Sequence, residues 1–156
     1  MPPTASLRHG GGSMVDFRTR ILIVEDDARM RRAIRLMLKN SGFIDIEEDD
    51  GQDPMAVLLT RRFGLILSDL KMEPFSGLDL LKRVRDEPKL ADIPFIMITG
   101  ASEQPLVQSA LSLGVNGYIV KPFDGTTLLR KVSTVLSQAR TAAARSRSGG
   151  DGTPGP

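Results

Sequence analysis

Side chains suited to acid, metal and phosphate chemistry recur where short apolar stretches end. They are the acid triplet Glu25-Asp26-Asp27, the single Asp69, the hydroxyl of Thr99 and the ammonium of Lys121. Carboxylates brought together repel one another, so a cluster of them needs a cation to neutralise it. The donors are all oxygens, which selects a hard ion. Mg²⁺ fits best, because it takes a few carboxylates and shares phosphate oxygens.

This set of groups suits phosphoryl transfer. Asp69 would attack the phosphorus, while Mg²⁺ and Lys121 would balance the charge on the transferred oxygens. Each group also has a structural explanation. The acid triplet can begin a helix, because acids there favour the helix dipole, Asp69 can cap a loop, and Lys121 can be a solvated lysine. Because the whole set falls at successive strand ends, we favour the functional interpretation.

The elements that must position these residues alternate along the chain. Apolar runs rich in β-branched residues predict strands near residues 20–24, 43–46, 65–67, 93–98 and 118–120. Apolar residues at helical spacing predict helices near residues 30–38, 55–59, 78–84, 106–113 and 128–136. The second helix is expected to be short and distorted, because Pro54 suits only a first helical turn. Strands that alternate with helices predict a parallel sheet covered on both faces, with ligands bound beyond the carboxyl ends of its strands.

The length of 156 residues fits one domain with tails. We expect a disordered extension over residues 1–17, a domain over residues 18–138, and a helix end followed by a disordered tail over residues 139–156. The chain has no Cys, which excludes disulfides and thiolate metal sites and fits a reducing compartment. Its apolar runs are too short to span a bilayer, and its start lacks a secretory signal. We therefore expect a cytoplasmic protein without membrane contact.

The charges are unevenly distributed along the chain. Residues 1–20 carry Arg8, Arg18, Arg20 and Asp16, and residues 140–156 carry Arg140, Arg145, Arg147 and Asp151. Each end is therefore net positive, while the part between them is mildly acidic. We do not expect the domain itself to bind nucleic acid.

Five stretches carry a resemblance to a known family. They are ILIVEDD at residues 21–27, LSDLKM at 67–72, GLDLL at 77–81, IMIT at 96–99 and GYIVKPF at 117–123. In their order and spacing they resemble the response-regulator receiver domains of two-component systems, of the stand-alone CheY-like type. The resemblance covers roughly residues 18–138. It implies an α/β flavodoxin-like fold, in which a doubly wound five-stranded parallel sheet of order 2-1-3-4-5 carries five helices.

The resemblance also implies a role for each matching residue. Asp69 is the expected phospho-acceptor, and Thr99 and Lys121 are the expected partners of the phosphoryl group. The implied Mg²⁺ ligands are Asp26, Asp69, the backbone carbonyl of Lys71 and, through a water, Glu25. Tyr118 is expected to turn inward when Thr99 moves, and Pro122 is expected to follow a cis peptide bond.

Implied partners are a histidine kinase or histidine phosphotransfer protein and a downstream protein. The downstream protein would bind the face made by the fourth helix, fifth strand and last helix. The chain departs from the family pattern at Glu73-Pro74, where the family usually has proline directly at position 73, so the loop after the third strand is expected to differ in shape. Glu73 and Lys71 can either adjust metal and phosphate binding or be merely solvated.

Three functions stay open at this point. No effector domain follows the receiver-like part, so we expect a single-domain response regulator that is not an enzyme and switches a partner in phosphorelay signalling, with chemotaxis or motility as one setting. The alternative is a phosphorelay shuttle or phosphate sink without switched output, and a substitution at Tyr118 or Thr99 would separate the two. A third hypothesis is an anionic-ligand-binding module that uses Arg140, Arg145 and Arg147.

Overall fold

The computed structural model describes residues 6–9 and 13–151, and its centre is a five-stranded parallel sheet. The strands of this sheet are β3 (Ile21–Val24), β4 (Ile46–Asp49), β5 (Leu65–Asp69), β6 (Phe95–Thr99) and β7 (Gly117–Val120). Their spatial order is β4-β3-β5-β6-β7. The predicted flavodoxin-like order 2-1-3-4-5 is therefore confirmed, and the carboxyl ends of all five strands lie at one edge.

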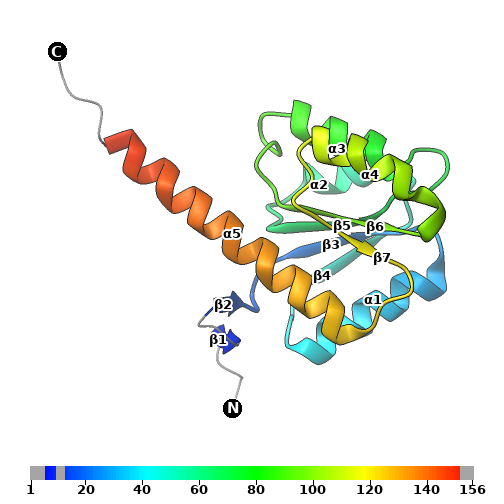
Figure 1. Ribbon diagram of the computed structural model, residues 1–156, viewed down its shortest axis with the longest axis horizontal. Coiled ribbons are helices and arrows are strands. Elements are labelled where there is room, and N and C mark those ends of the chain that lie inside the picture. The colour runs from blue at the N-terminus through cyan, green and yellow to red at the C-terminus, as the bar shows by residue number, and fades with distance from the viewer. Residues whose placement is uncertain (1–5, 10–12, 152–156) are drawn as a thin grey trace.

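Five α-helices cover the two faces of the sheet. They are α1 (Ala28–Ser41), α2 (Pro54–Leu58), α3 (Gly77–Asp86), α4 (Val107–Ser112) and α5 (Gly125–Asp151), and a 3-10 helix, η1 (Ala101–Leu106), precedes α4. Helices α1 and α5 lie on one face, and α2, α3 and α4 lie on the other (Figure 1). Within the described residues, no helix is long and apolar enough to cross a membrane.

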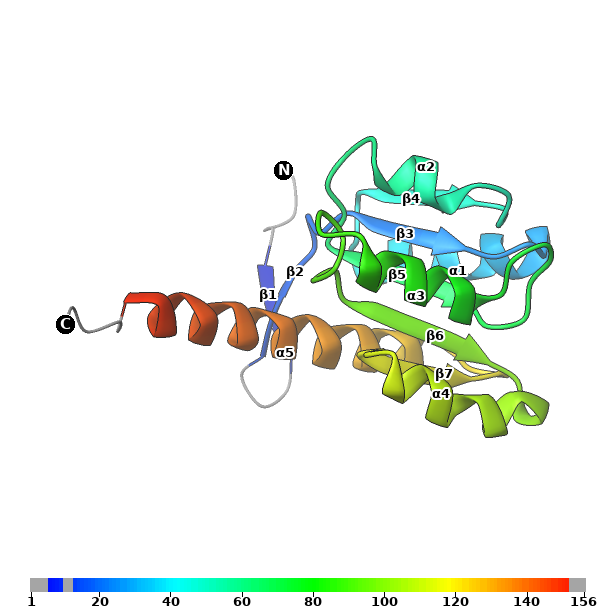
Figure 2. The ribbon, with the colours of Figure 1, turned by 90° about the horizontal axis from the view of Figure 1, so that it is seen from above.

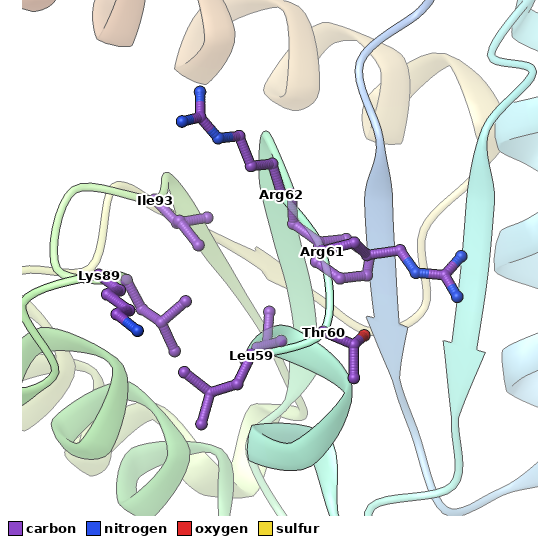
Figure 3. Close-up of a pocket in the computed structure, with 9 residues that line it drawn as sticks. Leu59, Thr60, Arg61, Arg62, Lys89 and Ile93 are labelled. Atoms are coloured by element: carbon purple, nitrogen blue, oxygen red, sulfur yellow. The ribbon is translucent and has the colours of Figure 1, made fainter.

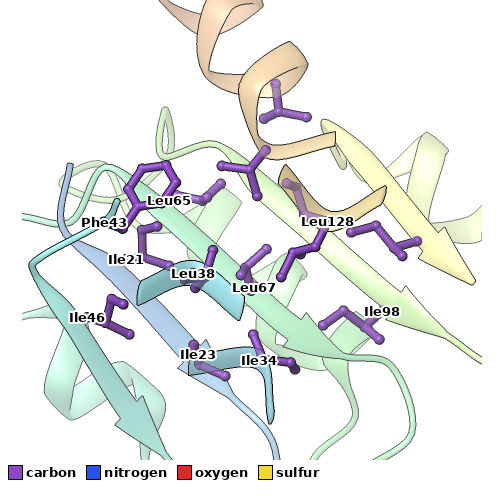
Figure 4. Close-up of a cluster of buried hydrophobic side chains, with 14 of the residues drawn as sticks. Ile21, Ile23, Ile34, Leu38, Phe43, Ile46, Leu65, Leu67, Ile98 and Leu128 are labelled. Atoms are coloured by element: carbon purple, nitrogen blue, oxygen red, sulfur yellow. The ribbon is translucent and has the colours of Figure 1, made fainter. Parts of the chain in front are cut away.

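Two hydrophobic clusters hold the layers together. On the first face, Ile34 and Leu38 of α1 and Leu128 of α5 pack on Ile21, Ile23, Leu65, Leu67 and Ile98 of the sheet (Figure 4). On the second face, Leu58, Leu80 and Leu81 pack on Leu22, Ile66 and Met97. All four residues of β3 and all five of β5 and β6 are buried. Burial on both faces explains why the sequences of these strands are almost continuously apolar.

Local signals place the helix ends. Asp27 caps α1 by accepting hydrogen bonds from the backbone of Arg29 and Met30, and Gly42 ends it in the left-handed region at φ 117°. Ser76 and Asp79 form a reciprocal capping box at the start of α3. The second helix has only five residues and begins at Pro54, as the sequence predicts.

Strand β4, the second strand of the parallel sheet along the chain, begins later than the sequence predicts. Phe43 and Ile44 lie before β4 rather than in it. Phe43 is buried with its ring 5.0 Å from that of Phe17, whereas Ile44 is 68% exposed. The left-handed Gly42 turns the chain out of α1, and these two residues lie in the connection to β4, outside the ladder of the sheet.

Part of the segment 1–17, which the sequence predicts to be disordered, is described as strands in the structure. Strands β1 (Ser6–His9) and β2 (Ser13–Asp16) form an antiparallel pair that crosses α5 (Figure 2). Val15 and Phe17 are buried in the first hydrophobic cluster. The composition of this Gly- and Pro-rich stretch favours disorder, but the two buried apolar side chains at its end tie it to the hydrophobic core.

The C-terminal helix is longer than the sequence predicts. Helix α5 continues through residue 151, where the expectation was a helix end and disorder after residue 138, and it extends past the sheet (Figures 1 and 2). Residues 139–147 are mostly Ala and Arg, which are strong helix formers. The last residues of the predicted tail, 152–156, lie outside the described residues.

Candidate functional site

The ends of β3 and β5 bring the predicted acids together. Val24 pairs with Ser68 in the register of these strands, so Glu25 and Asp69 occupy neighbouring positions at the carboxyl edge. Ligand oxygens of Glu25, Asp26 and Asp69 lie within 4.8 Å of one another. Glu25 and Asp69 are buried while Asp26 is exposed, so the cluster is open to solvent on one side.

Lys121 supplies the positive charge of the cluster. It follows β7, and its Nζ lies 3.0 Å from Asp69 Oδ1 and 3.5 Å from Glu25 Oε1. Burial lowers the pKa of Lys121, but the hydrogen bond and charge of Asp69, aided by Glu25, outweigh it and leave the pKa above its ordinary value. The ammonium group therefore stays charged and fixed beside Asp69.

The carboxyl group of Glu25 is the most perturbed in the site. Its pKa is raised to about 8, chiefly by burial and then by the hydrogen bond and charge of Asp69, which together outweigh the lowering by the charge of Lys121. Its Oε2 atom is buried without a hydrogen-bond partner. An orphaned carboxylate oxygen beside two further carboxylates is what a bound cation would satisfy.

The donor set fits Mg²⁺. Among the described residues, the only group of three or more acids, histidines or cysteines close enough to share a metal is Glu25, Asp26 and Asp69. All offer carboxylate oxygens, which a hard, small cation prefers. The ligand roles of Asp26, Asp69, Glu25 and the Lys71 carbonyl stay predictions.

The acid triplet divides into two roles. Asp27 begins the helix, as one explanation of the triplet expected, because its carboxylate caps α1. Glu25 and Asp26 instead join the acid cluster. Arg31, one turn into α1, donates to the backbone carbonyl of Glu25 at 2.6 Å and pairs with Glu48 of β4. Sequence reasoning did not find Arg31. Its signal is a basic residue four positions after the helix cap, which faces back toward the strand end.

A close approach of backbones holds Asp69 in place. The amide of Leu70 donates to the Ile98 carbonyl at 2.8 Å, and the amide of Gly77 donates to the Leu70 carbonyl at 2.8 Å. A side chain at Gly77 would overlap the backbone oxygen of Asp69 and the sulfur of Met97. Helix α3 therefore begins directly against the strand end that carries Asp69. Sequence reasoning missed Gly77, although a glycine at a helix start is a visible signal.

The two predicted switch residues lie along β6 and β7. Thr99 is buried, and its hydroxyl donates to the backbone carbonyl of Ile119 at 3.5 Å. Tyr118 is 36% exposed, with Lys131 Nζ of α5 5.9 Å from its ring centre. The hydroxyl is thus bonded to β7, and the tyrosine is partly exposed.

The loop between β5 and α3 contains the departures from the family pattern. Lys71 and Glu73 are exposed, and the Glu73–Pro74 peptide bond is cis. The Lys121–Pro122 bond is also cis, so that prediction is confirmed. The unusual loop shape expected from Glu73-Pro74 takes the form of a second cis peptide, which the sequence did not predict.

A family model for the response regulator receiver domain matches residues 21–133 of the chain. The chain belongs to this family. The receiver is 37% identical over 120 residues to the chemotaxis protein CheY-3 of Vibrio cholerae serotype O1, covering 76% of this chain and 92% of that protein. It is 35% identical to the chemotaxis protein CheY of Pseudomonas aeruginosa, over 76% of this chain and 97% of the relative.

Solved structures agree with this assignment. The chemotaxis response regulator CheY4 of Vibrio cholerae superposes on the receiver with a TM-score of 0.70 at 28% identity, covering 76% of this chain and 98% of the other. A receiver protein from Pseudomonas putida gives 0.67 at 34% identity, over 75% and 97%. The chain is therefore a receiver domain that resembles the chemotaxis response regulators and acts in signalling.

Proposed function

We propose that this receiver accepts a phosphoryl group on Asp69, in a Mg²⁺-dependent reaction, from a histidine kinase or a histidine phosphotransfer protein. The observation that carries the proposal is the Asp69 carboxylate, buried at the strand end and 3.0 Å from Lys121 Nζ, with two further carboxylates beside it. A structural carboxylate needs only a cation partner. A cluster of three with an orphaned oxygen needs a second positive charge, which a bound metal ion would supply.

The chain's own residues would divide the work of transfer. An oxygen of Asp69 forms the new bond to phosphorus as the bond from phosphorus to the donor's imidazole nitrogen breaks, which leaves an acyl phosphate. Lys121, whose Nζ lies 3.0 Å from Asp69 Oδ1, would hold a phosphoryl oxygen through its ammonium group. Asp26, Asp69 and the Lys71 carbonyl would hold Mg²⁺, with Glu25 acting through a water. When bound, the metal supplies charge neutralisation for the transferred oxygens.

We further propose that the phosphoryl group switches a partner-binding face. The Thr99 hydroxyl would leave the Ile119 carbonyl for a phosphoryl oxygen, and Tyr118 would turn inward into the space that it vacates. The face made by α4, β7 and α5 carries the exposed apolar side chains of Leu111, Tyr118 and Val120. A change there would be read by a downstream protein in the cytoplasm, and the names of the CheY relatives suggest a chemotaxis setting.

Tyrosine fluorescence tests the switch without a label. Tyr118 is the only Tyr of the chain, which has no Trp, so the signal comes from this side chain alone. We expect Mg²⁺ and a small phosphodonor together to change the emission of the wild type, and neither to do so alone. Asp69→Asn should show no change. Thr99→Val should gain the phosphoryl group, measured in parallel by intact mass, yet keep its emission unchanged.

The alternative is a shuttle or phosphate sink that passes the group on without switched output. A wild-type emission that stays constant while the intact mass increases would favour this alternative over the switch. The exposed Tyr118 and the Thr99 hydrogen bond to β7 favour the switch. In either case the chemistry is self-phosphorylation and autodephosphorylation, not catalysis on a separate substrate.

The hypothesis of an anionic-ligand module through the arginine-rich tail has less support. Arg140 and Arg145 are both exposed, on the part of α5 that extends past the sheet. The side chain of Arg147 lies outside the described residues. The tail offers two described arginines without aromatic side chains between them, which is a weak surface for nucleic acid.

A further inference from the structure

A hollow lies at the amino-terminal ends of the strands, on the opposite side of the sheet from the edge that carries Asp69. It has a volume of about 600 Å³, and its walls come from the end of α2, the segment before β5 and the connection between α3 and β6. Asp69 ends β5, whereas the hollow adjoins the start of that strand. The five residues of β5 separate the two places by about 13 Å along the strand, at roughly 3.3 Å per residue.

The floor and walls of the hollow are apolar. Leu58, Phe63 and Leu90 are buried beneath it, and Ile93 is partly exposed at its side. Leu59 is 53% exposed, and in Figure 3 it and Ile93 point toward the open space between the ribbons. A single exposed leucine is common on protein surfaces. Here it completes a concave apolar wall, which is unusual on a free surface.

The rim of the hollow is basic. Arg61, Arg62 and Lys89 line it, and none of its lining residues is acidic. Arg61 reaches toward β4, where it pairs with Glu47. Arg62 and Lys89 lie on different sides of the hollow (Figure 3). Within the part of the chain that the structure describes, neither side chain forms an ion pair.

We propose that this hollow binds an acidic segment of a partner protein, with one apolar side chain of the segment inserted beside Leu59 and Ile93. Its acidic residues would pair with Arg62 and Lys89. The apolar wall and the basic rim complement a segment that carries acids on either side of an apolar side chain.

The surroundings favour a short acidic segment over a polyanion or an anionic lipid surface. Glu87 and Asp92 lie in the same connection as Lys89 and Ile93, and they would repel an extended array of phosphates. A peptide can place its acids opposite Arg62 and Lys89 alone. The only aromatic ring in the lining, that of Phe63, is buried, so a nucleic-acid base has no ring to stack on.

A methyl NMR titration of the unphosphorylated protein tests the proposal independently of phosphoryl acceptance. The probe is a capped heptapeptide with a central Leu, one acidic residue on each side of it and Ser or Ala elsewhere, compared with the same peptide carrying Asn or Gln in place of its two acids. We expect the acidic peptide to shift the Leu59 and Ile93 methyl signals in a saturable way. The neutral peptide should bind at least about tenfold more weakly, because two rim ion pairs together are worth roughly a factor of ten.

Charge reversal provides the matched variants. The pair Arg62→Glu with Lys89→Glu should weaken binding of the acidic peptide by at least about tenfold. The pair Arg29→Glu with Lys39→Glu, at exposed positions of α1, should leave it unchanged. The proposal is overturned if the methyl signals do not shift, if both variant pairs lose affinity equally, or if decanoate saturates the hollow while the peptide does not.

Discussion

At the scale of single residues, the buried carboxyl group of Glu25 is held among charges that oppose its ionisation. Its pKa in the folded protein is about 8, against an ordinary value of 4.5, chiefly because of burial. Between these two values the folded protein retains a proton that the unfolded chain releases. Stability of the metal-free protein should therefore fall as pH rises from about 5 to about 8.

The variant Glu25→Gln isolates this effect. Glutamine cannot ionise, so the variant should lose less stability than the wild type as pH rises through that window, with the gap largest near pH 8 and above. Urea unfolding in a chelator, repeated at several pH values, measures the gap. The control is Glu87→Gln, at the partly exposed end of α3. Parallel stability curves for the wild type and Glu25→Gln would contradict this account of the site.

Gly77 sets how closely α3 approaches the acceptor. A methyl group there would overlap the Asp69 backbone oxygen, so Gly77→Ala should destabilise the protein by about 1–3 kcal/mol and slow phosphorylation of Asp69. A methyl group at Gly125, the first residue of α5, would meet Met37 at an ordinary 3.7 Å. Urea denaturation should therefore leave Gly125→Ala near wild type, and equal losses in the two variants would count against the close approach.

The sequence predicted which residues gather at the site but not how each is held. Strand ends are visible as apolar runs followed by polar residues, so Glu25, Asp69 and Lys121 could be placed at one edge. Whether an acid in the triplet caps the helix or faces the cluster depends on where the chain turns after Val24. That turn is set by tertiary packing, and the helix-cap role of Asp27 therefore emerged only from the structure.

At the scale of elements, Arg85 ties together two connections that lie far apart in the sequence. Its guanidinium donates to the carbonyls of Ala91 and Ile93 on one side and to Gly114 and the Asn116 side chain on the other, at 2.8–3.2 Å. Asn116 in turn accepts from the amide of Phe95, the first residue of β6. The network fixes where β6 and β7 enter the sheet.

Removing the guanidinium should therefore cost far more than its surface position suggests. We expect Arg85→Met to lower the free energy of unfolding by about 2–3 kcal/mol, because hydrogen bonds from a charged donor are lost while the aliphatic packing is kept. Arg83→Met removes a cation over the exposed Phe75 ring at 5.0 Å and should cost about 1 kcal/mol or less. Chemical denaturation compares the two, and a loss for Arg85→Met no greater than for Arg83→Met would refute the network.

The elements themselves were largely predictable, since buried parallel strands and amphipathic helices have clear periods. The errors fall where local composition and tertiary burial disagree. Phe43 and Ile44 have strand-like composition, yet they lie in the connection between the left-handed Gly42 and β4. The Gly- and Pro-rich start of the chain favours disorder by composition, yet Val15 and Phe17 are buried in the core.

At the scale of the whole molecule, the domain extends beyond the residues that match the family. The family model begins at residue 21, but Phe17 is only 4% exposed and packs edge-on against Phe43. The segment before the sheet is therefore part of the folded core. Together with the long α5, which β2 contacts, it forms an addition to the receiver on one side of the sheet.

Phe17→Ala tests whether this addition contributes to stability. Loss of a buried aromatic side chain should lower the free energy of unfolding by about 3–5 kcal/mol. Arg18→Ala, at the neighbouring exposed position, should lie within about 0.5 kcal/mol of wild type. Thermal and urea unfolding measure both. If Phe17→Ala were as stable as Arg18→Ala, residues before β3 would not belong to the core.

The measurement that tests the central claim most directly is the intact mass of the protein after incubation with a small phosphodonor, with Mg²⁺ or with a chelator. The account predicts a gain of one phosphoryl group that requires Mg²⁺, maps to Asp69 after borohydride reduction of the acyl phosphate, and is absent from Asp69→Asn. A wild type that gains no phosphoryl group in the presence of Mg²⁺, or that gains it equally in Asp69→Asn, would contradict the account.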